Sequence, residues 1–68
     1  MNEEAFNLSV RKLLKQFGVT AQREVEKAVD EAIEAGRLRG VESLSARITM
    51  QVEGLTTDIN VEGRITLA

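Results

Sequence analysis

The spacing of apolar residues changes once along this chain, and that change limits the folds it can adopt. Up to Gly36, apolar residues recur every three or four positions, which is the period of an amphipathic helix. From Leu44 onward they alternate with polar residues, which is the period of a half-buried β-strand. We therefore predict an α+β fold in the order ααββ. The 68 residues suffice for one domain, residues 1–68.

The first half predicts two helices, over about 3–17 and about 21–35. Asn2 is a suitable N-cap for the first helix, and Gly18 stands where a left-handed C-cap would end it. Thr20 is placed to cap the second helix and Gly36 to end it. Because the connection at Gly18 is short, we expect a helical hairpin. The two apolar stripes are Phe6, Val10, Leu13, Leu14 and Phe17, and then Val25, Ala28, Val29, Ala32 and Ile33.

The second half predicts an antiparallel β-hairpin with strands over about 44–53 and 56–67. A two-residue turn at Gly54-Leu55 has glycine first, as a type II′ turn requires. This register places Arg47 opposite Glu62, whereas a shift by two residues would place Arg47 opposite Arg64. A turn at Glu62-Gly63, which would create a third strand, is an open alternative. The parity of the apolar residues argues against it unless a bulge forms.

A lone hairpin is barely stable in water, so we expect its apolar face to lie on the helical hairpin in a two-layer domain. Both strands would then be edge strands with unpaired backbone groups. One outcome is a homodimer in which two hairpins pair edge to edge into a four-stranded sheet. The other is a monomer whose edges are protected by the charged residues Arg47, Glu53 and Arg64.

The composition excludes most catalytic and metal chemistry. The chain has no Cys, His, Trp, Tyr or Pro, which removes thiolate nucleophiles, disulfides, histidine bases and the usual zinc ligands. We expect no enzyme activity, no cofactor and no metal. The acidic start and the lack of a long apolar run argue against a signal peptide and a membrane span, so we expect a cytoplasmic protein.

Three residues are candidates for contact with a partner. Leu8 lies off the first apolar stripe among basic residues, although a single exposed leucine needs no special explanation. Arg37 and Arg39 form a small basic turn that could meet phosphate or an acidic partner. The simpler interpretation is that they offset the helix dipole and the acidic residues before them. Glu26, Asp30 and Glu34 share a helix face, which is more typical of a solvated surface than of a metal site.

Several short motifs along the whole chain resemble a family of very small bacterial proteins described only as a domain of unknown function. The family often has serine at the position of Ala21, so Thr20 would cap the second helix alone here. The resemblance implies a compact cytosolic bacterial protein, without an activity, catalytic residue or ligand to transfer. It rests on Phe6-Asn7, Arg11-Lys12, Leu14-Lys15-Gln16, Gly18-Val19-Thr20, Gln22-Arg23-Glu24, Ala35-Gly36-Arg37-Leu38, Val52-Glu53-Gly54 and Gly63-Arg64-Ile65.

Together these features favour a small, non-catalytic structural or protein-interaction module that associates with itself or with another protein. The alternative is a nucleic-acid-binding module of winged-helix layout, with the hairpin as the wing. Residues 19–36 contain two basic and five acidic side chains, a net charge of −3 that would repel phosphates. A winged helix also has a third helix, which the pattern does not predict. Nucleic acid is therefore the less favoured partner.

Overall fold

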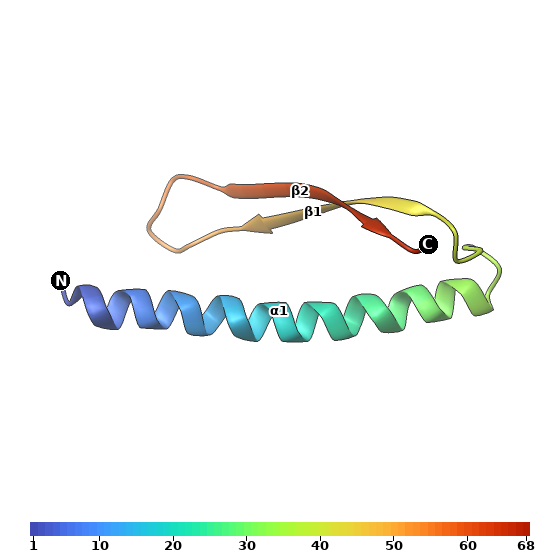
Figure 1. Cartoon of the computed structure of the whole chain (residues 1–68). Coiled ribbons are helices and arrows are strands. Elements are labelled where there is room, and N and C mark those ends of the chain that lie inside the picture. Colours follow the sequence, from blue (N-terminus) through green and yellow to red (C-terminus); the bar gives the residue numbers. More distant parts are fainter. The chain divides into compact units, whose positions relative to one another are not determined.

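The computed structural model describes all 68 residues and contains three elements, which are labelled in Figure 1. They are helix α1 (Glu3–Glu34), strand β1 (Ser43–Met50) and strand β2 (Ile59–Thr66). The α+β class and the helix-first order are confirmed. The chain divides into two compact units, Met1–Arg37 and Leu38–Ala68, which we describe separately. The predicted packing of a helical layer on the sheet stays a prediction.

The first unit contains one continuous helix, so the predicted helical hairpin is wrong. Helix α1 has 32 residues and a length of about 48 Å at 1.5 Å per residue, and Figure 1 shows it as an uninterrupted coil. Gly18 keeps a negative φ, and a Cβ placed there would meet nothing within 4 Å. A glycine inside a helix costs about 1 kcal/mol relative to alanine, which is too little to end a helix that continues on both sides. Ala21 then joins the two apolar stripes into one.

Both ends of α1 lie where the sequence predicts them. The Asn2 side chain caps the first turn by accepting a hydrogen bond from the backbone N–H of Ala5 at 3.0 Å. At the other end Gly36 has a φ of 78°. Gly36 donates to the carbonyl of Ile33 at 3.1 Å, and Arg37 donates to the carbonyl of Ala32 at 2.9 Å. These two bonds form a Schellman motif, which needs glycine in the left-handed position. Thr20 lies inside α1 and caps nothing.

The second unit is a two-stranded antiparallel hairpin in the predicted register. Arg47 lies opposite Glu62, and Ala46 lies opposite Gly63. Gly63 is therefore inside β2, and the alternative with a third strand is wrong. One face carries only apolar or small residues, and the other carries polar residues. The apolar-face pairs are Leu44 with Ile65, Ala46 with Gly63, Ile48 with Val61, and Met50 with Ile59.

The strands are shorter than predicted because the turn differs. The ladder ends at Met50 and Ile59, and residues 51–58 connect the strands. Within this loop the N–H of Leu55 donates to the carbonyl of Val52 at 3.1 Å, so Glu53 and Gly54 are the central residues. Gly54 has a φ of 83° in the second central position, where a type II turn requires glycine. The predicted type II′ turn with Gly54 first is therefore wrong, although its register is right.

The free edges of the hairpin follow from one further hydrogen bond. The N–H of Leu67 donates to the carbonyl of Glu42 at 2.9 Å, one position beyond the two strands. In an antiparallel ladder, alternate residues point their backbone groups to the same side. The even-numbered residues of β1 and the odd-numbered residues of β2 therefore bond to each other. The outward backbone groups on β2 belong to Asn60, Glu62, Arg64 and Thr66, and those on β1 to Ser43, Ser45, Arg47 and Thr49.

No side chain of this chain is buried. On α1 the largest apolar side chains, Phe6 and Phe17, remain 51% and 47% exposed, and on the hairpin Val61 remains 57% exposed. Both units therefore present an apolar face without an enclosed core. No helix is long and apolar enough to cross a membrane.

Candidate interaction surfaces

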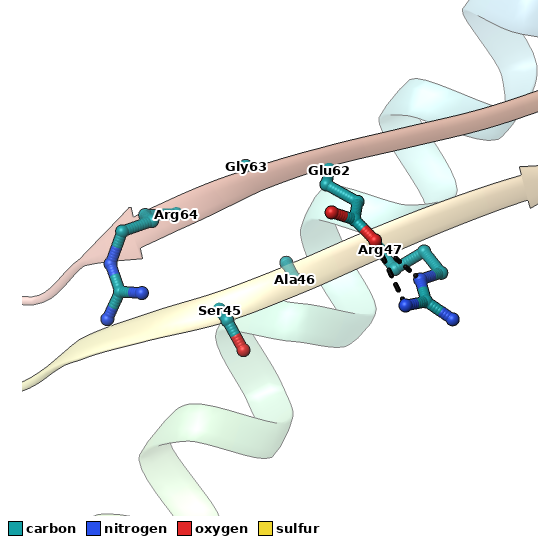
Figure 2. Close-up of a pocket in the computed structure, with 6 residues that line it drawn as sticks. All are labelled: Ser45, Ala46, Arg47, Glu62, Gly63 and Arg64. Carbon is teal, nitrogen blue, oxygen red and sulfur yellow. Dashed lines mark hydrogen bonds and ion pairs between the residues drawn. The ribbon is translucent and has the colours of Figure 1, made fainter.

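The polar face of the hairpin is connected by side-chain hydrogen bonds between the strands. Arg47 binds Glu62 through an ion pair of 2.9 Å and a hydrogen bond of 3.1 Å. Figure 2 shows the Glu62 carboxylate reaching across from β2 to the guanidinium of Arg47 on β1. The hydroxyl of Thr49 donates to the amide oxygen of Asn60 at 2.9 Å. These bonds favour the observed register, but each lies in solvent, so each contributes little stability.

Arg64 completes this network at the other end of the hairpin. Its guanidinium donates to the hydroxyl and to the carbonyl of Ser43, at 2.9 and 2.7 Å. The Ser43 carbonyl is one of the outward groups on the free edge of β1. That edge is therefore partly occupied by a side chain of its own hairpin, whereas the outward backbone groups of β2 have no partner strand.

A shallow hollow lies in the middle of the hairpin, where Ala46 and Gly63 face each other (Figure 2). Neither of these two residues has a side chain beyond Cβ. The hollow has no Cys or His, and its one carboxylate, Glu62, is already paired with Arg47. Its other lining residues are Ser45 and Arg64. This composition offers no nucleophile next to a base, so the hollow is a surface feature without an evident reaction.

The basic turn after α1 contains its own anion. The carboxylate of Glu42 accepts hydrogen bonds from the backbone N–H groups of Arg39, Gly40 and Val41, at 2.9 to 3.1 Å. These hydrogen bonds hold the pKa of Glu42 below its ordinary value, and the bond from Arg39 has the largest effect. Desolvation opposes them with a smaller effect. Successive N–H groups of this kind make an anion site, and Glu42 fills it. Sequence reasoning missed this role of Glu42, because no sequence pattern indicates that an acidic loop residue accepts hydrogen bonds from the backbone of the preceding turn.

The three predicted contact residues are not brought together by the structure. Leu8 is 67% exposed on α1, away from the apolar stripe. Arg37 lies just beyond the end of α1, near the opposite end of this unit from Leu8. Neither Arg37 nor Arg39 forms an ion pair, so their guanidinium groups are available. Contact of these residues with a partner stays a prediction. No three acidic side chains, including those at positions 26, 30 and 34, lie close enough to hold a metal ion.

The free edge of β2 has a symmetry that sequence reasoning missed. Around Gly63 the strand is complementary to its own reverse: residues at equal distances from the glycine are both apolar, both uncharged and polar, or of opposite charge. Acidic Glu62 and basic Arg64 flank the glycine, followed by the β-branched residues Val61 and Ile65. Asn60 and Thr66 are the next pair outward. The signal was available in the sequence, but it becomes meaningful only once β2 is known to have an unpaired side.

These features define a class: a small α+β protein made of one helix and one hairpin, without a recognisable catalytic or metal site. The whole chain, residues 1–68, matches the family described as "Family of unknown function (DUF6494)". The chain belongs to this family, which confirms the resemblance given by its short motifs. Neither the curated proteins nor the solved structures include a significant match to it.

Proposed function

We propose that this protein is a non-catalytic interaction module of the cytoplasm that forms a homodimer through the free edge of β2. The observation that supports the proposal is the pattern of β2 around Gly63, which is complementary to itself when the strand is reversed. A hairpin with an unpaired, self-complementary edge can add a second copy as further strands of the same sheet.

The pairing is antiparallel and centred on Gly63 of both copies. Glu62 then lies opposite Arg64 of the second copy, and the symmetry repeats this pair. Directly opposed charges of opposite sign stabilise a ladder, whereas a register that opposes like charges weakens it. On the apolar face, Val61 lies opposite Ile65 of the second copy. The four strands form one sheet in the order β1-β2-β2-β1, with one continuous apolar face.

The opposite edge is less suited to the same role. The carbonyl of Ser43 on the β1 edge already accepts a hydrogen bond from Arg64. A β1 pair centred on Arg47 would also place two arginines opposite each other, which is unfavourable. No observation of this kind supports nucleic-acid binding: there is one helix where a winged helix has three, and the N–H groups of the basic turn are occupied by Glu42.

Two proline variants on opposite edges test the proposal. Thr66→Pro removes an outward N–H from β2, and Ser45→Pro removes one from β1. Neither residue donates a side-chain hydrogen bond in the hairpin, and neither N–H bonds within the ladder, so both hairpins should form. Light scattering after size exclusion should find a dimer of 15 kDa, twice the 7.5 kDa chain, for the natural protein and for Ser45→Pro.

Thr66→Pro should shift this equilibrium toward the monomer. By symmetry the dimer loses two hydrogen bonds of about 1 kcal/mol each, which corresponds to a dissociation constant about 30-fold higher. A natural protein that remains a 7.5 kDa monomer at high micromolar concentration contradicts the proposal. Equal dimerisation of both proline variants would also contradict it, because the dimer would then not use β2.

A further inference from the structure

Helix α1 carries one apolar stripe from end to end, and the stripe repeats every 11 residues. Phe6, Phe17 and Ala28 are 11 positions apart, as are Val10, Ala21 and Ala32. Eleven residues in three turns is a period of 3.67, close to that of a straight helix, so the stripe stays on one side of α1. The full stripe consists of Phe6, Val10, Leu13, Leu14, Phe17, Ala21, Val25, Ala28, Val29, Ala32 and Ile33.

The stripe is large at one end and small at the other. Its first five residues are two phenylalanines, two leucines and a valine, whereas its last six are three alanines, two valines and an isoleucine. Large side chains fill space well against small ones, and two large or two small residues in one layer give strain or voids. A second copy of α1 in the reverse direction supplies the complementary sizes, but a parallel copy does not.

The charges of α1 are distributed in the same complementary way. Residues 5–22 contain three basic side chains and no acidic one, a net charge of +3. Residues 23–34 contain two basic and five acidic side chains, a net charge of −3. An antiparallel pair places each basic half beside an acidic half, whereas a parallel pair places like charges together.

From these two gradients we propose that α1 binds α1 of a second copy in the antiparallel direction, with the two helices crossing near Val19. This register sets Phe6 beside Ala32 of the second copy and Val10 beside Ala28. At the centre Phe17 lies beside Ala21 of the second copy. The pairing uses the first unit alone and does not depend on the β2 edge.

Spin labels on the face opposite the stripe test the direction and the crossing point. The chain has no cysteine, so Leu8→Cys, Val19→Cys and Asp30→Cys each provide one attachment site on this face. In the antiparallel pair the two Val19 labels have no separation along the helix axis. The two Leu8 labels, and likewise the two Asp30 labels, are separated along the axis by about 33 Å, because 22 residues rise 1.5 Å each. A parallel pair gives the same distance at all three positions.

A pair of arginine variants tests the stripe itself. Ala28→Arg places a charge on the stripe, while Glu24 and Glu31, four and three residues away, favour arginine on the isolated helix. Ala5→Arg places the same charge outside the stripe. Circular dichroism should show that both variants keep their helix. Ala28→Arg should raise the dissociation constant at least about 100-fold, since each copy leaves a charge in an apolar contact, and Ala5→Arg should leave it nearly unchanged.

The possible results separate this inference from the proposed function. The α1 pairing is supported independently of β2 by one pattern of distances between labels on the two copies. The Val19 distance is short, the Leu8 and Asp30 distances are long and equal, and all three persist in Thr66→Pro. A dimer that Thr66→Pro abolishes, and that shows no such distance pattern, overturns the α1 pairing while the β2 proposal stands. Equal distances at all three label positions also overturn the antiparallel α1 pairing. So does the absence of any measurable distance between copies, which is expected if the stripe is covered within one chain.

Discussion

Replacing Gly18 by alanine should stabilise this protein. Gly18 lies inside α1 with a negative φ, and a Cβ at this position meets no atom within 4 Å. Alanine therefore fits without strain and restricts the unfolded chain more than glycine does.

The expected magnitude follows from the helix propensity. Alanine is favoured over glycine inside a helix by about 0.8–1.0 kcal/mol. The entropy of unfolding is about 2.1 cal/mol/K per residue, or about 0.14 kcal/mol/K for a chain of this length unfolding as one unit. The melting temperature should thus rise by about 6 °C. Thermal unfolding followed by circular dichroism at the helix band measures this shift.

Gly36→Ala is the matched control because it is the same substitution at a left-handed glycine. Gly36 has a φ of 78° in the Schellman motif, where alanine costs about 1–2 kcal/mol. The melting temperature should fall in this variant. If Gly18→Ala also lowers the melting temperature, Gly18 occupies a chain reversal and the continuous helix is incorrect. The experiment thus decides directly between one helix and the helical hairpin that the sequence suggested.

Three further substitutions test the caps and the charges. Asn2→Ala should destabilise α1 by about 1 kcal/mol, measured by thermal unfolding, because it removes the N-cap acceptor. Arg47→Ala should cost less than about 1 kcal/mol, and the loss should shrink in 1 M NaCl, because the ion pair with Glu62 is exposed. The lowered pKa of Glu42 means that its hydrogen bonds stabilise the loop above pH 4.5 and are lost as the pH falls further. The amide NMR signal of Arg39 should titrate in that acidic range, and Glu42→Gln should abolish the titration.

The hairpin could be predicted from sequence because its signals agree with one another. The alternation of apolar and polar residues assigns each side chain to one face of the hairpin. Registers that differ by two residues leave these faces unchanged, and the charge pair of Arg47 and Glu62 selects one of them. The turn was predicted less well, since Gly54 satisfies either of two turn types and the residues around it follow no period. The register was still predicted correctly, because it depends on the paired residues of the strands and not on the turn type.

The helix was misjudged because Gly18 is a strong local signal and its cost is small. Two apolar stripes on either side of a glycine resemble two helices, but Ala21 lies four residues from Phe17 and from Val25 and connects them. Continuing the helix satisfies the backbone groups that a turn would leave without partners. The symmetry of β2 could be found from the sequence alone, whereas the role of Glu42 could not, because it depends on the conformation of the loop.

The loop between the strands has a practical consequence. Residues 51–58 lie outside the ladder. The one backbone hydrogen bond of their turn joins two residues of the loop, Leu55 and Val52. An insertion beside Gly54 breaks this one hydrogen bond and otherwise alters the entropy of closing a loop, which grows slowly with each added residue. A short epitope or fluorophore tag can therefore be inserted beside Gly54, leaving both termini of the protein untouched.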